Sequence, residues 1–339
     1  MQFEATESER ERGEFQAYRL AEITSSIRAN GFAVVSNLIS HETCELLGDA
    51  IINDAQRVLA LGKPTRHEQV TAAGHLQLGL RRYAPFVRAD LVANPLIESV
   101  VAGMLGNGAW LGFYNGNVNC PGSAVQPLHF DRPYTWKTPG AAKAGGVDWP
   151  PPTTTLSCSV ALTEITAATG ATEIYPGTHL ETAVAGWKQG ERPANHPELV
   201  AKWEPSARME IPRGGVCFRD PRMWHRGVSN TSGVVRPMIA LTYHASMAKH
   251  WRGLVNHDMR GEDMQRCEAD PTLKLMDDGT LGDGQLVFDV SSQPAFEEEP
   301  EREVRRNVRF VEAPYVVNHF LDAHNVGGAR VAENEPIAP

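Results

Sequence analysis

The chain has 339 residues and a net charge of −9, from 32 Lys and Arg against 41 Asp and Glu. This acidic balance excludes a general binder of the nucleic-acid phosphate backbone, which needs a basic face. With 42% hydrophobic and 22% charged residues, the composition is typical of a folded globular protein and excludes wholesale disorder.

The sequence carries no signal for a membrane or for secretion. No apolar run approaches the roughly 18 residues of a membrane-spanning helix, and the charged first twenty residues lack the apolar core of a signal peptide. The five cysteines are odd in number and widely spaced, without a CxxC pair, which argues against a disulfide framework and a thiolate zinc site. We therefore expect a cytoplasmic protein without a membrane partner.

The first third of the chain is predicted to be mainly helical. Residues 1–15 are polar and are expected to form a flexible arm. Beyond them, residues 16–105 form a helical N-terminal layer: apolar periodicity and capping residues, among them Gly31 and Ser40, predict helices over 16–30, 41–61 and 96–105 and a buried strand over 32–35.

From Trp110 onward, short β-branched and aromatic runs alternate with turn residues, as is typical of an antiparallel barrel or sandwich. We assign residues 106–250 to this β core. Residues 137–152 are rich in Gly, Pro and Ala and predict a long loop. Residues 251–339 contain no assignable motif and form a C-terminal extension, so the expectation is a single catalytic domain over 1–339.

The sharpest chemical feature is His129-Phe130-Asp131. Alternate residues of a strand point to the same side, so the imidazole and the carboxylate emerge together; a surface His–Asp hydrogen bond is the alternative. His225, 94 residues after Asp131, is the best candidate for a second imidazole. Two imidazoles and one carboxylate form the facial triad of non-haem Fe(II) oxygenases, which leaves coordination positions open for a 2-oxo acid and O₂.

A 2-oxo acid also needs a cation for its distal carboxylate. Arg236 follows His225 by 11 residues in the apolar run VVRPMIALTY, and a returning strand would bring its guanidinium beside the metal. Arginine binds carboxylates through two parallel hydrogen bonds, which suits this role. A salt bridge at the rim is the alternative for Arg236.

These features together resemble the phytanoyl-CoA dioxygenase (PhyH-like) family of Fe(II)/2-oxoglutarate-dependent oxygenases. The resemblance rests on HFD at 129–131, GATEIYPGTH at 170–179, WHRGVSN at 224–230, the Arg236 offset and the opening GFAVVSNLIS at 31–40. It covers roughly residues 16–250. It implies a mainly β fold with flanking helices around a double-stranded β-helix, or jelly-roll, core of cupin-like type.

The resemblance also implies roles for individual residues. His129, Asp131 and His225 would bind iron, and Arg236 would bind the distal carboxylate of 2-oxoglutarate. The remaining cosubstrate positions would be taken by Thr172, Gln126, Asn117 and Tyr114. Thr172 and Gln126 could equally be ordinary polar groups of strands. The carboxylate of Asp131 favours hydroxylation, desaturation or rearrangement over halogenation, because related halogenating enzymes have a small residue at that position.

The Pro- and Gly-rich loop is a departure from the common family pattern. We interpret it as a lid or a substrate-facing loop, with Arg132, Tyr134, Trp136 and Trp149 as candidate substrate contacts. Local packing of these aromatic side chains is the alternative. They suit a bulky, partly apolar molecule, and the absence of a basic cluster makes a free small molecule, such as a specialised metabolite, a better substrate than a CoA thioester.

The sequence thus predicts an enzyme that uses Fe(II), 2-oxoglutarate and O₂ to oxidise a small molecule, releasing succinate and CO₂. Two alternatives from other classes remain: a non-catalytic jelly-roll protein that binds a metal or ligand, and a cupin-type metalloenzyme that does not use 2-oxoglutarate. A nucleic-acid partner is disfavoured by the acidic charge, and a homodimer is possible.

Overall fold

The structure is a computed structural model. It describes residues 1–245 apart from 61, 63, 65–67, 70, 80–84, 87, 93, 107–108 and 189. It also describes two short paired strands, β11 (Lys274–Leu275) and β12 (Leu281–Gly282). The remainder of the expected C-terminal extension, 251–339, lies outside the described residues.

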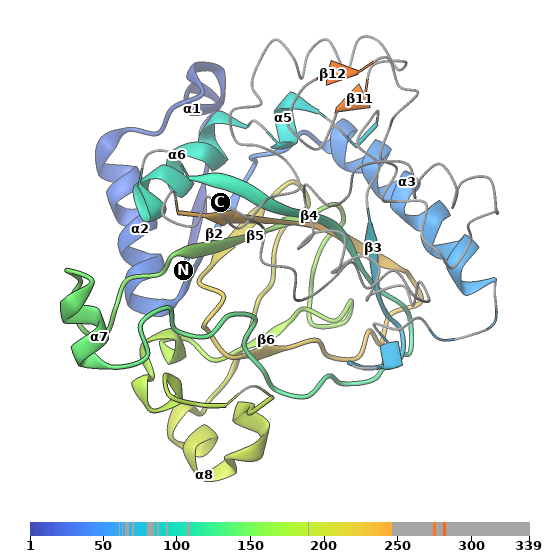
Figure 1. Ribbon diagram of the computed structural model, residues 1–339. Helices are drawn as coiled ribbons and strands as arrows, with labels where there is room; N and C mark the ends of the chain where they lie inside the picture. Colours follow the sequence, from blue (N-terminus) through green and yellow to red (C-terminus); the bar gives the residue numbers. More distant parts are fainter. Residues whose placement is uncertain are drawn as a thin grey trace.

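Two β-sheets form the core of the described chain (Figure 1). The larger sheet has seven strands in the order β1-β2-β8-β5-β10-β4-β3, and the smaller has three in the order β7-β6-β9. The strands of the larger sheet are β1 (Gln2–Glu4), β2 (Phe32–Ser36), β3 (His75–Gly79), β4 (Trp110–Asn119), β5 (Thr155–Ala161), β8 (Val216–Arg219) and β10 (Arg236–His244). Those of the smaller sheet are β6 (Glu173–Ile174), β7 (Ala207–Arg208) and β9 (His225–Arg226).

The two-residue period of the strands divides the larger sheet into an apolar face and a polar face. On β10, Ile239 and Leu241 pack into the main hydrophobic core, while Arg236, Ala240 and Thr242 line a cavity on the other side. The neighbouring strand β5 shows the same division, with Leu156, Cys158 and Val160 in the core and Ser157 and Ser159 at the cavity. Because antiparallel pairing keeps this alternation in register across strands, one face of the sheet is left free for a polar site.

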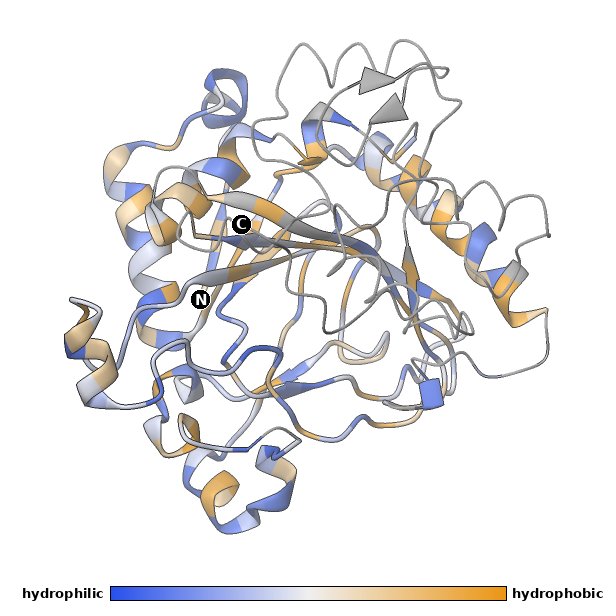
Figure 2. Ribbon diagram, in the orientation of Figure 1, coloured by the Kyte–Doolittle hydropathy of each residue, from blue (hydrophilic) through white to orange (hydrophobic). Residues whose placement is uncertain are grey.

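Helices cover the apolar face of the larger sheet. The longest three are α2 (Ala17–Asn30), α3 (His41–Leu59) and α6 (Pro95–Leu105), and they contact strands β2, β10 and β5 respectively. Shorter helices are α1 (Glu7–Arg12), α5 (Ala89–Val92), α7 (Pro139–Ala144) and α8 (Pro197–Val200). Figure 2 shows apolar and polar residues alternating along α3, as amphipathic packing on a sheet requires.

The predicted helix boundaries are confirmed at their capping residues. The Ser40 side chain accepts a hydrogen bond from the Thr43 backbone N–H at the start of α3. Gly31 ends α2 with φ at 85°, in the left-handed region that glycine adopts at low cost. A Cβ there would also lie 2.8 Å from Nδ1 of His179, so the position excludes larger residues on two grounds.

The expectation of a flexible arm over residues 1–15 is wrong. Strand β1 pairs in parallel with β2, and Thr6 and Glu9 form a reciprocal capping box at the start of α1. The Glu9 carboxylate also forms an ion pair with Arg19 at 2.8 Å. Polar composition misled the prediction, because this segment is anchored by backbone pairing and by a few buried side chains, among them Ala5 and Phe15.

Two further expectations are modified by the structure. The segment 127–136 is irregular and not a strand, with one backbone bridge at His129. The expected loop 137–152 contains the short helix α7, whose N-cap Thr138 accepts a hydrogen bond from Ala141 N–H. Among the helices that the structure describes, none has the length and apolar character needed to cross a membrane.

The anchoring of the N-terminus can be tested with a pair of neighbouring aromatic residues. Phe15 is 3% exposed and Tyr18 is 60% exposed. We expect Phe15→Ala to lower the free energy of unfolding by about 3–5 kcal/mol, because it leaves a cavity in the core. Tyr18→Ala should change it by less than about 0.5 kcal/mol. Equal small effects in urea denaturation would show that the segment is a loose arm after all.

Candidate metal and cosubstrate site

Two histidines far apart in the chain lie directly opposite each other. His129 and His225 form an antiparallel backbone bridge, in which His129 N–H donates to His225 O at 3.0 Å and His225 N–H donates to His129 O at 2.8 Å. Opposite residues of such a pair project to the same side. Their imidazole rings are accordingly close, with centroids 4.4 Å apart.

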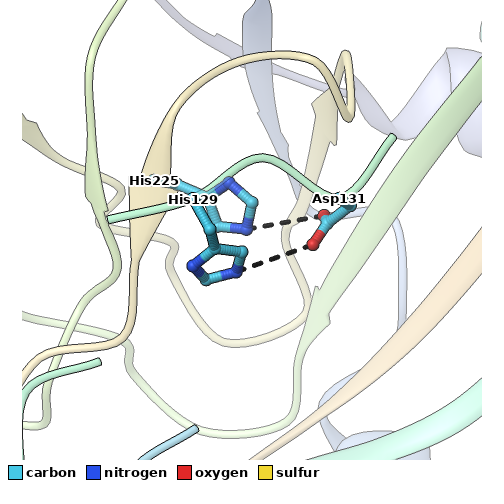
Figure 3. Close-up of side chains that lie close together, drawn as sticks. All are labelled: His129, Asp131 and His225. Atoms are coloured by element: carbon cyan, nitrogen blue, oxygen red, sulfur yellow. Dashed lines mark ion pairs between the residues drawn. The ribbon is translucent and has the colours of Figure 1, made fainter. Parts of the chain in front are cut away.

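Asp131 completes a cluster with these two rings. Its Oδ1 lies 3.7 Å from Nε2 of His129, and its Oδ2 lies 3.4 Å from Nε2 of His225. Figure 3 shows both imidazole rings turned toward this carboxylate. The backbone N–H of Asp131 donates to Pro221 O at 2.9 Å, which holds the turn after His129 against the segment that precedes His225. One donor atom from each of the three residues lies within 4.8 Å of the others.

Each imidazole has its Nδ1 directed at a backbone carbonyl two residues earlier. Nδ1 of His129 lies 2.8 Å from Pro127 O, and Nδ1 of His225 lies 3.0 Å from Met223 O. A carbonyl can only accept, so at His129 it favours the proton on Nδ1 and leaves the lone pair on Nε2, whereas Nδ1 of His225 also lies 3.1 Å from Nη1 of Arg219, which can only donate. Both Nε2 atoms face Asp131. The three side chains therefore present two imidazole nitrogens and one carboxylate to a common point, which fits the ligand set of a non-haem Fe(II) centre.

Arg219 supports this cluster from the end of β8. Its Nη2 donates to Oδ2 of Asp131 at 2.6 Å, and its Nη1 lies 3.1 Å from Nδ1 of His225. The guanidinium is buried, with 7% of the side chain exposed. A charge-assisted bond of this kind fixes one carboxylate oxygen and leaves Oδ1 for a metal. The sequence prediction missed Arg219, although an inward-facing arginine at the end of the buried run VCFR was a usable signal.

The surroundings set the charge of the cluster. Burial, and next the neighbouring His225, lower the pKa of His129 to about 4, so this imidazole is neutral at physiological pH. Burial alone would raise the pKa of Asp131, but the charges of His225 and Arg219 outweigh it and hold that pKa well below its usual value. Neutral imidazole and ionised carboxylate are the protonation states that bind a metal.

Arg236 lies in the wall of the same cavity, which has a volume of about 360 Å³. It is 4% exposed. Its Nη2 donates to Gly170 O at 3.2 Å, and its Nε has no hydrogen-bond partner among the described residues. No acidic residue in that part of the chain pairs with it. Burial lowers its pKa to about 10, so it is still a cation at neutral pH, and a buried cation without a counter-ion is a ready receptor for an anion.

Three of the four further cosubstrate candidates line this cavity, namely Thr172, Gln126 and Asn117. The Gln126 side-chain carbonyl accepts a hydrogen bond from Gly227 N–H at 2.9 Å, which ties it to the residue that follows β9. The prediction that Tyr114 contacts the cosubstrate is wrong. It is fully buried in the main core, and its hydroxyl donates to Phe86 O. Tyr114 lies three residues from Asn117 on β4, so the two side chains point to opposite faces.

Of the four substrate candidates, Arg132 lines the cavity. Tyr134 is buried in a separate apolar cluster with Trp224, and its hydroxyl donates to His179 O at 2.6 Å. Trp149 packs near Tyr134, with ring centroids 6.2 Å apart, and Trp136 lies against Gly145. These three aromatic residues therefore pack locally, as in the alternative interpretation of the sequence, and they do not line the cavity as substrate contacts.

The cavity also contains polar residues that the sequence prediction did not single out. They come from β3 and β5 and include His75, Gln77, Ser157 and Ser159. Nε2 of His75 lies 2.7 Å from Ala124 O, and burial lowers the pKa of this imidazole. Polar side chains at alternate positions of otherwise apolar strands were the available signal for this group.

Comparison with known proteins places the chain in a family. The family model described as phytanoyl-CoA dioxygenase (PhyH) matches residues 27–238. The dioxygenase AndF of Emericella variicolor is 23% identical over 224 residues, which cover 63% of this chain and 70% of AndF.

Solved structures with a similar chain course include an enzyme of nogalamycin biosynthesis. The carbocyclase SnoK of nogalamycin biosynthesis, described as α-ketoglutarate-dependent, has a TM-score of 0.48 at 19% identity. The match covers 66% of this chain and 83% of SnoK. AviO1 of Streptomyces viridochromogenes has a TM-score of 0.48 at 19% identity. The match covers 68% of this chain and 96% of AviO1.

The family model spans well over half of the sequence and includes the whole His129–Asp131–His225 cluster and Arg236. The chain belongs to the phytanoyl-CoA dioxygenase family and is a non-haem dioxygenase that depends on Fe(II) and 2-oxoglutarate.

Proposed function

We propose that this protein oxidises a C–H bond of a small molecule, by hydroxylation, desaturation or rearrangement, with His129, Asp131 and His225 as the iron ligands. In this proposal, Arg236 binds the distal carboxylate of 2-oxoglutarate. The observation that carries it is the buried Arg236 guanidinium, which has no acidic partner among the described residues and lies in the same cavity as the three ligands.

The architecture supports the same proposal. A larger and a smaller sheet contribute to one cavity: Arg236 comes from the larger sheet and His225 from the smaller. We interpret this core as the double-stranded β-helix, or jelly-roll, that the sequence predicts. The cavity volume of about 360 Å³ is in the range of small-molecule sites, which supports a small-molecule substrate, and we propose a specialised metabolite.

In this proposal, different residues of the chain position the iron ligands and contact the cosubstrate. Iron, when bound, supplies the activation of O₂ that is coupled to the conversion of 2-oxoglutarate into succinate and CO₂. Arg219 holds the Asp131 carboxylate in place, and the carbonyls of Pro127 and Met223 hold the two rings. Thr172, Gln126 and Asn117 line the cavity that Arg236 shares and would contact the cosubstrate there.

The two alternative functions are less well supported by the cavity. A metal-binding protein without catalysis, or a cupin-type enzyme that does not use 2-oxoglutarate, has no need of a buried unpaired cation beside the metal ligands. Retaining such a charge costs free energy unless an anion binds to it. Arg236 therefore favours the 2-oxoglutarate-dependent reaction over both alternatives.

The ligand assignment predicts a loss of metal binding. We expect His129→Ala and His225→Ala each to weaken Fe(II) binding at least about 100-fold, which corresponds to about 2.8 kcal/mol, in anaerobic calorimetric titrations. Each substitution removes one of three ligands and leaves an incomplete set. His41→Ala, which removes an exposed histidine on α3, is the control and should bind Fe(II) like the wild type. Retention of affinity within twofold in both ligand variants would reject the assignment.

The role of Arg236 predicts a separate loss of cosubstrate affinity. We expect Arg236→Met to bind Fe(II) normally and to weaken 2-oxoglutarate binding at least about 100-fold, again about 2.8 kcal/mol. The readout is the visible charge-transfer band of the anaerobic Fe(II)–2-oxoglutarate complex, followed by succinate formation in air.

Stability and a matched tyrosine provide the controls for this variant. Because Arg236 has no ion-pair partner in the described part of the chain, Arg236→Met should change the free energy of unfolding by no more than about 1 kcal/mol. Tyr114→Phe, which alters the residue now placed in the core, should leave 2-oxoglutarate affinity unchanged. An Arg236→Met protein with normal cosubstrate affinity would instead support the cupin-type alternative.

A further inference from the structure

A second cavity lies against the outer side of the same ligand cluster. Its volume is about 390 Å³. It shares four lining residues with the first cavity: Thr71, Gln126, His129 and Asp131. The two cavities thus meet at the proposed iron ligands, with Arg236 at the first cavity and not at the second. A molecule in the second cavity could therefore approach the reacting centre while 2-oxoglutarate occupies the first.

One wall of this second cavity is aromatic and apolar. Phe130, which lies between the two ligands His129 and Asp131, faces Trp187 with ring centroids 6.2 Å apart, and Val184 adds an aliphatic side chain. The Trp187 ring is stacked on His196, with centroids 4.4 Å apart and an interplanar angle of 24°. Because this stacking fixes the indole before any ligand arrives, the wall is suited to a flat apolar ring system.

The lining also contains three cationic side chains. Lys137, Lys188 and Arg192 come from two separate segments, and none of the three forms an ion pair within the described residues, where the nearby carboxylates of Glu191 and Asp131 pair with His196 and Arg219. Glu191 is the acidic residue between them, and its carboxylate is already engaged by the Lys188 backbone N–H and lies 3.7 Å from Nε2 of His196. The Asp131 carboxylate, which also lines the cavity, is bound by Arg219. The three cations thus outnumber the two carboxylates of the lining, in a chain of net charge −9, and attract an anion to this point.

We propose that this second cavity is the substrate site and that the substrate is a bulky apolar or aromatic ring system bearing a carboxylate. The ring would lie against Phe130 and Trp187, and the carboxylate against Lys188 and Arg192. This inference rests on the proposed function for the identity of the reacting centre. It replaces the loop aromatics Tyr134, Trp136 and Trp149, which line neither cavity, with a different set of side chains.

The test uses three naphthalene probes that share a ring and differ in charge: 2-naphthoate, neutral 2-naphthamide and cationic 2-naphthylmethylammonium. Each is titrated calorimetrically into the full-length protein, both metal-free and loaded anaerobically with Fe(II) and 2-oxoglutarate. We expect 2-naphthoate to bind at least 10-fold more tightly than the amide, and the ammonium to bind more weakly still. In the loaded protein, 2-naphthoate should also shift the charge-transfer band, because it lies beside the iron ligands.

Variants separate the charge from the aromatic wall. Lys188→Gln combined with Arg192→Gln should reduce the preference for naphthoate over naphthamide to less than threefold. Trp187→Ala should weaken both probes by a similar factor. The control is Lys143→Gln combined with Lys202→Gln, two exposed lysines that do not line the cavity, and it should retain the wild-type preference.

The outcomes distinguish this proposal from the function on which it rests. Equal affinity for all three probes, or a preference that survives in the Lys188 and Arg192 double variant, would overturn the substrate site while the charge-transfer band remained intact. Displacement of naphthoate by 2-oxoglutarate in the metal-free protein would place the probe at Arg236 and would also overturn it. Loss of the charge-transfer band in the wild type would instead reject the proposed function.

Discussion

The candidate site depends on two backbone hydrogen bonds that join His129 to His225 across 96 residues of sequence. Neither segment is a long strand at this point: β9 has two residues, and the chain around His129 is irregular. Register is nevertheless fixed, because a shift by one residue would turn one imidazole away from the other. The bond from Asp131 N–H to Pro221 O sets the third side chain against the same pair. The metal-binding geometry is thus a property of backbone pairing between two short segments.

Two buried arginines give the cavity its electrostatic character, and they differ in what compensates their charge. Arg219 is neutralised by Asp131, which is itself a proposed ligand, so this guanidinium serves to hold and orient the carboxylate. Arg236 has no such partner among the described residues, and burial has already lowered its pKa to about 10. A positive charge in that position is stabilised when an anion binds. In the proposed function, the same residue type therefore positions a ligand at one end of the cavity and receives the cosubstrate at the other.

Sequence reasoning succeeded where a regular pattern constrains the side chains. The start of β4 at Trp110 coincides with the predicted start of the β-rich part of the chain, and the cap at Ser40 marks the start of α3. The three clustered residues follow from a tripeptide and one distant histidine. Sequence reasoning failed where a strand forms by pairing with a distant segment. It also failed where the alternation of side chains between the two faces of a strand was ignored. Strand β1 exists because β2 pairs with it, which composition does not reveal. Tyr114 and Asn117 differ by an odd number of residues, so on one strand they could not both face the cavity.

The same distinction separates the two halves of the proposed active site. Strands of the larger sheet supply Arg236 and Asn117: Asn117 is paired on both sides, with Met238 of β10 and Gln77 of β3, and Arg236 is paired with Asn119 of β4. The second cavity is built instead from the turn at Phe130 and from the irregular segment around Trp187 and Lys188, which has no period for a sequence pattern to reveal. Loops of this kind tolerate substitution with little effect on the core. In this proposal, a paired sheet holds the cosubstrate beside a loop-built rim that selects the substrate, and substitutions in such a rim would direct the same oxidation chemistry at different molecules.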